Sequence, residues 1–113
     1  QQPITKNLHL VEPLGYLEFN YLVEKSKAVI TDSGGITEET TVMDIPCMTL
    51  RDNTERPETI DMGTNELLGV NPKAIALAMA TLFTGKWKSG SIPHLWDGKT
   101  AERIVNHLLQ LPC

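Results

Sequence analysis

The chain has 113 residues, with 41% hydrophobic and 21% charged side chains and a formal net charge of -4. That length suits one small domain and is too short for two, and the composition is globular rather than disordered. The acidic balance argues against a nucleic-acid binder, which must neutralise phosphates, and the lack of a run of about 18 apolar residues predicts no membrane-spanning helix.

The first half of the chain alternates short apolar runs with amphipathic stretches. Residues 28–31 form an almost continuously apolar run, which is typical of a strand buried on both faces. Before it, Leu17, Tyr21 and Leu22 stand at helical spacing. We expect strands at residues 8–11, 28–31 and 47–50, helices at residues 15–26 and 36–43, and a turn at residues 32–35.

The second half of the chain continues the alternation after a polar segment. Asn71 followed by Pro72 predicts a helix start, since Asn caps a helix and Pro fits its first turn. We expect one or two helical turns at residues 57–62, a strand at residues 66–70, a helix from residue 71 to about residue 84, a loop at residues 86–94 and a helix at residues 99–111. Strands that alternate with helices predict one α/β domain over residues 1–113, with a parallel sheet and crossover helices.

The turn before the second expected helix carries the clearest ligand signal. In open α/β sheets, ligands bind beyond the carboxyl ends of the strands, where Ser33, Gly34 and Gly35 fall. Consecutive glycines allow close approach of a ligand, and a helix N-terminus offers free N–H groups to a phosphate. A carboxylate of Glu38 or Glu39 could reach past the phosphate to a ribose diol. The glycines could also serve tight-turn geometry alone.

Two other interpretations of this turn fail. Asp-Ser-Gly-Gly at residues 32–35 also occurs at the nucleophile of trypsin-like proteases, but Thr31 precedes it here and the context is strand–turn–helix. A P-loop is excluded because no Gly-Lys-Ser/Thr closes the turn.

A second polar cluster, residues 51–58, follows the next expected strand and therefore should lie at the same edge of the sheet. An arginine here could reach a phosphate held at Gly34 and Gly35, because guanidinium presents a rigid fork of donors. The adjacent acids would hold the arginine in place. Two arginines among three acids are also typical of a solvated loop.

The other candidate residues carry weaker signals. On pattern alone Phe19 fits a core aromatic residue, and His94 is a loop histidine with little sign of a direct role. The histidines lack metal-ligand spacing, so no metal is expected. Cys47 and Cys113 are expected to be free thiols in a reducing compartment.

Three segments together resemble the non-hydrolysing UDP-N-acetylglucosamine 2-epimerases. They are Val-Glu-Pro-Leu-Gly-Tyr-Leu-Glu-Phe at residues 11–19, Thr-Asp-Ser-Gly-Gly-Ile-Thr-Glu-Glu at residues 31–39, and Arg-Asp-Asn-Thr-Glu-Arg-Pro-Glu at residues 51–58. Their order and spacing match the family, and the resemblance covers nearly the whole chain. The sequence departs from the family at Thr37, where Gln is common, and at residues 96–99, which replace a common Asn-Pro-Tyr-Gly-Asp-Gly stretch.

The resemblance implies the later, C-terminal part of the second Rossmann-like domain of a two-domain sugar-nucleotide fold. The ligand would be UDP or UDP-GlcNAc. The implied UDP-binding residues are Ser33, Gly34 and Gly35 for the diphosphate, Arg56 for the diphosphate side, Glu39 for the ribose hydroxyls, and the region around Phe19 beside the uracil.

The family interconverts UDP-GlcNAc and UDP-ManNAc, by eliminating UDP to give 2-acetamidoglucal and adding it back after the C2 configuration has changed. The resemblance requires no nicotinamide, metal or other cofactor. It places the acid/base carboxylates in the first domain and a functional histidine earlier in the second, so we expect no catalytic residue in this chain and no turnover by it alone. It also implies a cytoplasmic enzyme that supplies ManNAc units for surface polysaccharide.

The start at Gln1 and these missing segments predict a fragment, a processed chain or a trimmed one. The expected strand at residues 8–11 would then lack its neighbours, and an open apolar edge pairs readily with another chain. We therefore expect either a rearranged sheet or a strand-exchanged homodimer. Two other classes stay open, namely a non-catalytic α/β assembly module and part of a sugar-nucleotide glycosyltransferase.

Overall fold

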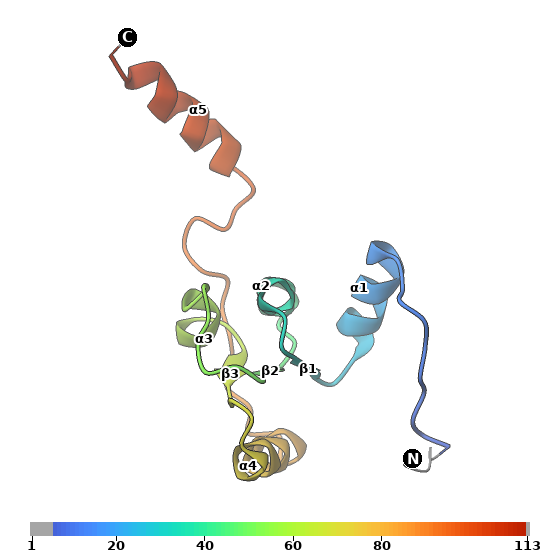
Figure 1. Cartoon of the computed structure of the whole chain (residues 1–113). Coiled ribbons are helices and arrows are strands. Elements are labelled where there is room, and N and C mark those ends of the chain that lie inside the picture. Colours follow the sequence, from blue (N-terminus) through green and yellow to red (C-terminus); the bar gives the residue numbers. More distant parts are fainter. Residues whose placement is uncertain (1–5, 113) are drawn as a thin grey trace.

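The computed structural model describes residues 6–112 and has a three-stranded parallel sheet with helices on both faces (Figure 1). The elements are α1 (Tyr16–Lys25), β1 (Val29–Thr31), α2 (Gly34–Met43), β2 (Cys47–Thr49), α3 (Glu58–Asp61), β3 (Asn65–Leu67), α4 (Pro72–Phe83) and α5 (Thr100–Gln110). The strand order is β1-β2-β3, and both pairs are parallel. The predicted α/β sheet with crossover helices is confirmed.

The connections between the strands determine which edge of the sheet can bind a ligand. Helix α2 joins β1 to β2, and α3 joins β2 to β3. Figure 1 shows α2 and α3 on one side of the sheet and α4 on the other. Because the strands are parallel, the segments that leave β1 and β2 emerge at the same edge, as the two polar clusters require.

Residues at the helix ends explain where α4 begins and where α3 and α4 end. The side chain of Asn71 accepts a hydrogen bond from the Lys73 N–H at 2.9 Å, and Pro72 is the first residue of α4. Beyond the other end of α4, Gly85 takes a left-handed φ of 73°, which favours glycine and ends the helix. Helix α3 stops before Gly63, as expected.

The core is small and largely polar. Its buried hydrophobic residues are Val23, Cys47, Met48 and Leu82, and its buried polar residues are Thr37, Thr40, Thr41, Thr49, Thr59, Thr64 and Asn65. The buried hydroxyls have partners, as burial requires: Thr40 and Thr41 both donate to the Thr37 carbonyl, at 3.1 and 2.8 Å.

Of the two expected free thiols, Cys47 is a buried free cysteine, and burial raises the pKa of its thiol. Cys113 lies outside the described residues.

Two strand expectations are wrong. Residues 8–11 form no strand, and Leu10 is 75% exposed. Strand β1 lies at the edge of the sheet, and its Ile30 is 49% exposed rather than buried on both faces. A strand needs a neighbour for its backbone groups, and within residues 6–112 nothing pairs with residues 8–11 or with the outer side of β1.

The molecule is elongated. Its radius of gyration is 17.4 Å and its longest extent is 64 Å, whereas a compact domain of this length has a radius of gyration of about 13 Å. Helix α5 projects away from the sheet, and the segment before α1 lies beyond α1, on the side away from α2 (Figure 1). Ile104 and Leu108 form an apolar stripe on α5, with Leu111 at its C-cap, and all three side chains are exposed.

Among the helices of residues 6–112, none has the length and apolar character that crossing a membrane requires.

Candidate functional site

The first part of the site is the N-terminus of α2, directly after β1. The helix begins at Gly34, two residues earlier than expected, and Ser33 is its N-cap. The Ser33 hydroxyl makes no capping hydrogen bond, while its N–H donates to the Thr31 hydroxyl at 3.0 Å. The first N–H groups of a helix have no partner within the helix, so this end can receive an anion.

The two glycines are explained by space rather than by backbone conformation. Neither takes a positive φ. A Cβ built at Gly35 would meet no atom within 4 Å, whereas one at Gly34 would lie 3.1 Å from Glu55 Oε2 and 3.8 Å from Arg51 Nη1. The surface beside Gly35 is thus open to a ligand, and the surface beside Gly34 faces the arginine-rich segment.

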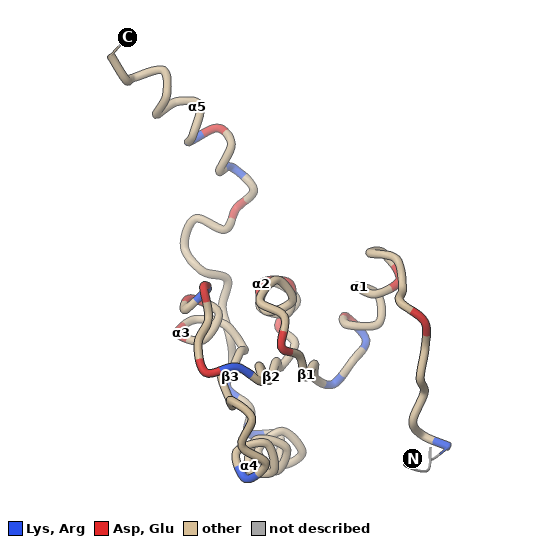
Figure 2. The backbone as a smooth tube through the Cα atoms, in the orientation of Figure 1, with Lys and Arg blue, Asp and Glu red and all other residues tan. Residues whose placement is uncertain are grey.

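That segment, residues 51–58, is the second part of the site. Figure 2 shows basic and acidic residues gathered where β2 leads into α3. Arg51 Nη2 contacts Glu55 Oε1 at 3.1 Å and Asn53 Oδ1 at 3.2 Å. Within the segment, Glu55 therefore holds Arg51 in place.

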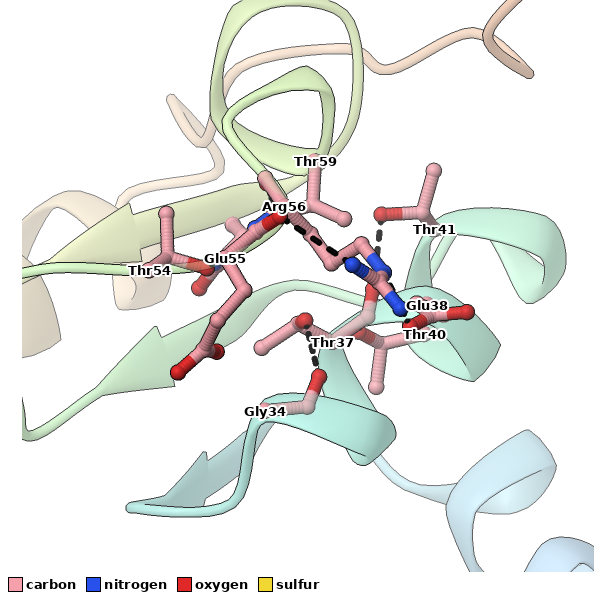
Figure 3. Close-up of polar contacts among 10 residues, drawn as sticks. Gly34, Thr37, Glu38, Thr40, Thr41, Thr54, Glu55, Arg56 and Thr59 are labelled. Carbon is pink, nitrogen blue, oxygen red and sulfur yellow. Dashed lines mark hydrogen bonds and ion pairs between the residues drawn. The ribbon is translucent and has the colours of Figure 1, made fainter.

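Arg56 is held differently, by a carboxylate on α2. Its Nε donates to Glu38 Oε1 at 2.7 Å and its Nη1 donates to the Glu55 carbonyl at 3.2 Å (Figure 3). The hydrogen bond and the charge of Glu38 raise the pKa of Arg56. These contacts use two of the five N–H donors of the guanidinium, so it keeps donors for a further acceptor.

Nearby hydrogen bonds also shift the pKa of the Glu55 carboxylate. A hydrogen bond from its own backbone and one from Arg51 lower the pKa of Glu55. Two guanidinium groups thus lie along α2: Arg51 faces Gly34 at the open end and pairs with Glu55, and Arg56 pairs with Glu38 one turn farther on.

The third part of the site is a cleft between α1 and α2. It has a volume of about 350 Å³ and is lined by Tyr16, Asn20, Glu38, Glu39, Val42, Met43 and Trp96. Glu39 is half-buried at this cleft, and Phe19 is half-buried on α1 beside Asn20. The Asn20 Oδ1 atom is buried and has no hydrogen-bond partner among residues 6–112.

The structure thus gathers most of the predicted site residues. Ser33, Gly34 and Gly35 form the open end of α2, Arg56 contacts Glu38 one turn farther along the same helix, and Glu39 lies next to Glu38 in the cleft. The sequence suggested Glu38 as an alternative to Glu39 for the ribose, not as the partner of Arg56, and it did not single out Tyr16 or Asn20. The last two stand four residues apart, which puts them on one face of α1, and that spacing could have identified them.

The other candidates contribute little. His94 is exposed and does not line this cleft. Within the part of the chain that the structure describes, no three His, Cys, Asp or Glu residues are grouped closely enough to hold a metal ion.

Comparison with known proteins gives the family context of this geometry. A family model described as UDP-N-acetylglucosamine 2-epimerase matches residues 2–109. The chain is 43% identical over 105 residues to the UDP-N-acetylglucosamine 2-epimerase of Methanocaldococcus jannaschii, covering 91% of this chain and 28% of that protein. It is 38% identical over 107 residues to the enzyme of Bacillus subtilis, covering 90% and 28%.

Solved structures agree with these sequence matches. The M. jannaschii UDP-GlcNAc 2-epimerase in complex with UDP-GlcNAc and UDP is similar with a TM-score of 0.74 and 42% identity, over 88% of this chain and 27% of that chain. The Neisseria meningitidis enzyme bound to UDP-GlcNAc gives 0.70 and 35%, over 93% and 30%. The chain spans about 28% of the length of the curated relatives that it matches.

Proposed function

This chain belongs to the UDP-N-acetylglucosamine 2-epimerase family, and from that premise we propose that it forms the UDP-holding wall of an epimerase site. The observation that supports this most is the open N-terminus of α2, with Arg51 facing Gly34 and Arg56 bound to Glu38 one turn farther along the helix. A diphosphate placed there meets free N–H groups, the positive end of the helix dipole and a guanidinium with unused donors.

The proposed roles follow the position of each residue. The N–H groups of Gly34 and Gly35, with the Ser33 hydroxyl, hold the diphosphate, and Arg56 binds its outer oxygens. Glu39 accepts hydrogen bonds from the ribose hydroxyls inside the cleft. The wall of α1 around Phe19 borders the uracil.

The test is a calorimetric titration of the chain with UDP, with ADP as the base control. We expect saturable binding that is selective for UDP. Arg56→Ala should weaken it by about 10- to 100-fold, because a hydrogen bond to a charged group contributes roughly 1.5–3 kcal/mol. Arg103→Ala is the matched control, since Arg103 also pairs with a carboxylate, Asp97, but on the segment that leads into α5.

The titration also decides between two classes of function. UDP binding that is weakened in Arg56→Ala and kept in Arg103→Ala supports the epimerase role. If the chain binds no UDP at millimolar concentration, it serves as a non-catalytic assembly module. The many exposed apolar side chains, such as Leu10 and Leu109, are the observation that favours this second candidate.

For the reaction, we propose that this wall takes part in the interconversion of UDP-GlcNAc and UDP-ManNAc, in the cytoplasm, for surface polysaccharide synthesis. No turnover is expected from the 113-residue chain alone, because the family resemblance assigns the acid/base residues to other segments. Incubation with UDP-GlcNAc and analysis of the sugar nucleotides checks this, and epimerisation by the chain alone would contradict it.

We propose further that the chain alone forms a homodimer, with strand exchange as the mode. Strand β1 has a free outer edge with Ile30 exposed, and residues 8–11 are extended and exposed. If residues 8–11 pair with β1 of a second copy, the backbone groups of both segments gain hydrogen-bond partners. Sedimentation velocity should show a dimer, and a monomer at high concentration would contradict the proposal.

A further inference from the structure

Three buried polar side chains form a continuous hydrogen-bonded chain beneath the arginine-rich segment. The Thr49 hydroxyl on β2 donates to Asn65 Oδ1 on β3 at 2.5 Å. The Asn65 amide donates to the Thr59 hydroxyl on α3 at 3.2 Å, and that hydroxyl donates to the Arg56 carbonyl at 2.8 Å. We call Thr49, Asn65 and Thr59 the polar relay; their exposed fractions are 1%, 0% and 0%.

We propose that the polar relay positions Arg56, with Asn65 as the residue that joins the sheet to the arginine segment. The proposal rests on the diphosphate role of Arg56 given above. It assigns Thr59 and Asn65 no contact with the ligand. They act through the main chain of Arg56. The hydrogen bond to the Arg56 carbonyl holds the backbone from which the guanidinium side chain extends.

The main chain of Arg56 has two kinds of anchor. Its N–H donates to the Thr54 hydroxyl at 3.0 Å, and its carbonyl accepts from the Thr59 N–H at 3.0 Å as well as from the Thr59 hydroxyl. The first two contacts lie within the loop and the start of α3, so they would move with it. The hydroxyl contact alone continues, through Asn65, to β2, whose neighbour β1 leads into the open end of α2.

The direction of each bond makes the relay specific. A threonine hydroxyl has one proton, and Thr59 gives its proton to the Arg56 carbonyl. It must then accept from Asn65, which turns the amide nitrogen toward α3 and leaves the amide oxygen for Thr49. If Thr59 no longer accepts, the Asn65 amide is left buried without a partner and the Arg56 carbonyl loses its link to the sheet.

The matched variants follow from this geometry. Thr59→Val keeps the shape of the side chain and removes the hydroxyl, while Thr59→Ser keeps the hydroxyl. Thr64→Val is the control, because Thr64 is also buried and also donates to a backbone carbonyl, that of Ile45 at 2.6 Å, away from the arginine segment.

The experiment titrates the chain and each variant with UDP and with uridine, which lacks phosphates. Thr59→Val should bind UDP about threefold to tenfold more weakly, the range for loss of one hydrogen bond, with uridine affinity unchanged. Thr59→Ser should restore UDP affinity, and Thr64→Val should keep it. Unchanged UDP binding in Thr59→Val, or equal losses for UDP and uridine, would overturn the proposal.

A second measurement separates this proposal from the UDP role itself. Amide hydrogen exchange of residues 51–58 should quicken in Thr59→Val and stay as in the unaltered chain in Thr64→Val, whether or not UDP binds. If the unaltered chain binds no UDP, the diphosphate role fails and exchange alone judges the relay. If Thr59→Val does not fold, Thr49→Val, which removes the donor at the far end of the relay, should show the same faster exchange; slow exchange there would overturn the relay.

Discussion

The adjacent residues Gly34 and Gly35 are both glycine, but the absence of a side chain has a different reason at each position. A methyl group at Gly34 would approach Glu55 and so press on the arginine segment. A methyl group at Gly35 would meet nothing in the protein. Since both have ordinary helical geometry, the protein alone gives no reason for glycine at Gly35, and a ligand surface does.

Gly35→Ala is therefore expected to separate stability from binding. Alanine favours the helix over glycine by up to about 1 kcal/mol, so the melting temperature should rise slightly. The added methyl group should weaken UDP binding, because it occupies the space proposed for the diphosphate. Thermal unfolding and a UDP titration on the same protein check both effects. A variant that is stabilised and binds UDP normally would remove Gly35 from the proposed site.

Pairing of side chains between segments was the part of the site least accessible from the sequence. The meeting of the glycine turn with residues 51–58 followed from strand order and was predicted. That Glu38 rather than a nearby acid holds Arg56 was not, because the two lie 18 residues apart and their contact depends on the rotation of α2 about its axis. The roles of Glu39 and Phe19 in binding stay predictions.

At the scale of elements, helices were predicted better than strands. Helix ends depend on nearby residues such as Asn71, Pro72 and Gly85, so a single sequence contains the signal. Strand formation depends on a partner strand. Residues 8–11 have the apolar character of a strand, but no strand within the described residues 6–112 pairs with them.

Gly63, between α3 and β3, should tolerate no side chain. A Cβ there would lie 2.5 Å from Thr41 Oγ1 and 2.6 Å from the Thr59 carbonyl, and backbone cannot move aside cheaply. Gly63→Ala should destabilise the fold by about 1–3 kcal/mol, the usual cost of overpacking. Urea unfolding monitored by circular dichroism measures this, with Gly35→Ala as the open-space control. Equal stability of the two variants would show that α3 and α2 can separate locally without cost.

For the whole molecule, the decisive property is how little apolar surface is covered. Among residues 6–112, the buried hydrophobic side chains are Val23, Cys47, Met48 and Leu82, while long apolar side chains on the N-terminal segment, α1 and α5 face solvent. The apolar stripe of α5 can be read from the spacing of Ile104 and Leu108, yet a sequence pattern cannot say what covers a stripe. An elongated shape and uncovered faces together favour association of the isolated chain.

Two charge substitutions distinguish the possible modes of association. Leu10 lies in the extended N-terminal segment and Leu108 on α5, and they are 75% and 59% exposed, so lysine at either position should leave the fold of one copy intact. If residues 8–11 pair with β1 of a second copy, Leu10→Lys should shift the sedimentation profile from dimer to monomer, because a charge on a strand that joins two chains opposes pairing. Leu108→Lys should then stay dimeric. The reverse result would contradict strand exchange and place the contact on the apolar stripe of α5.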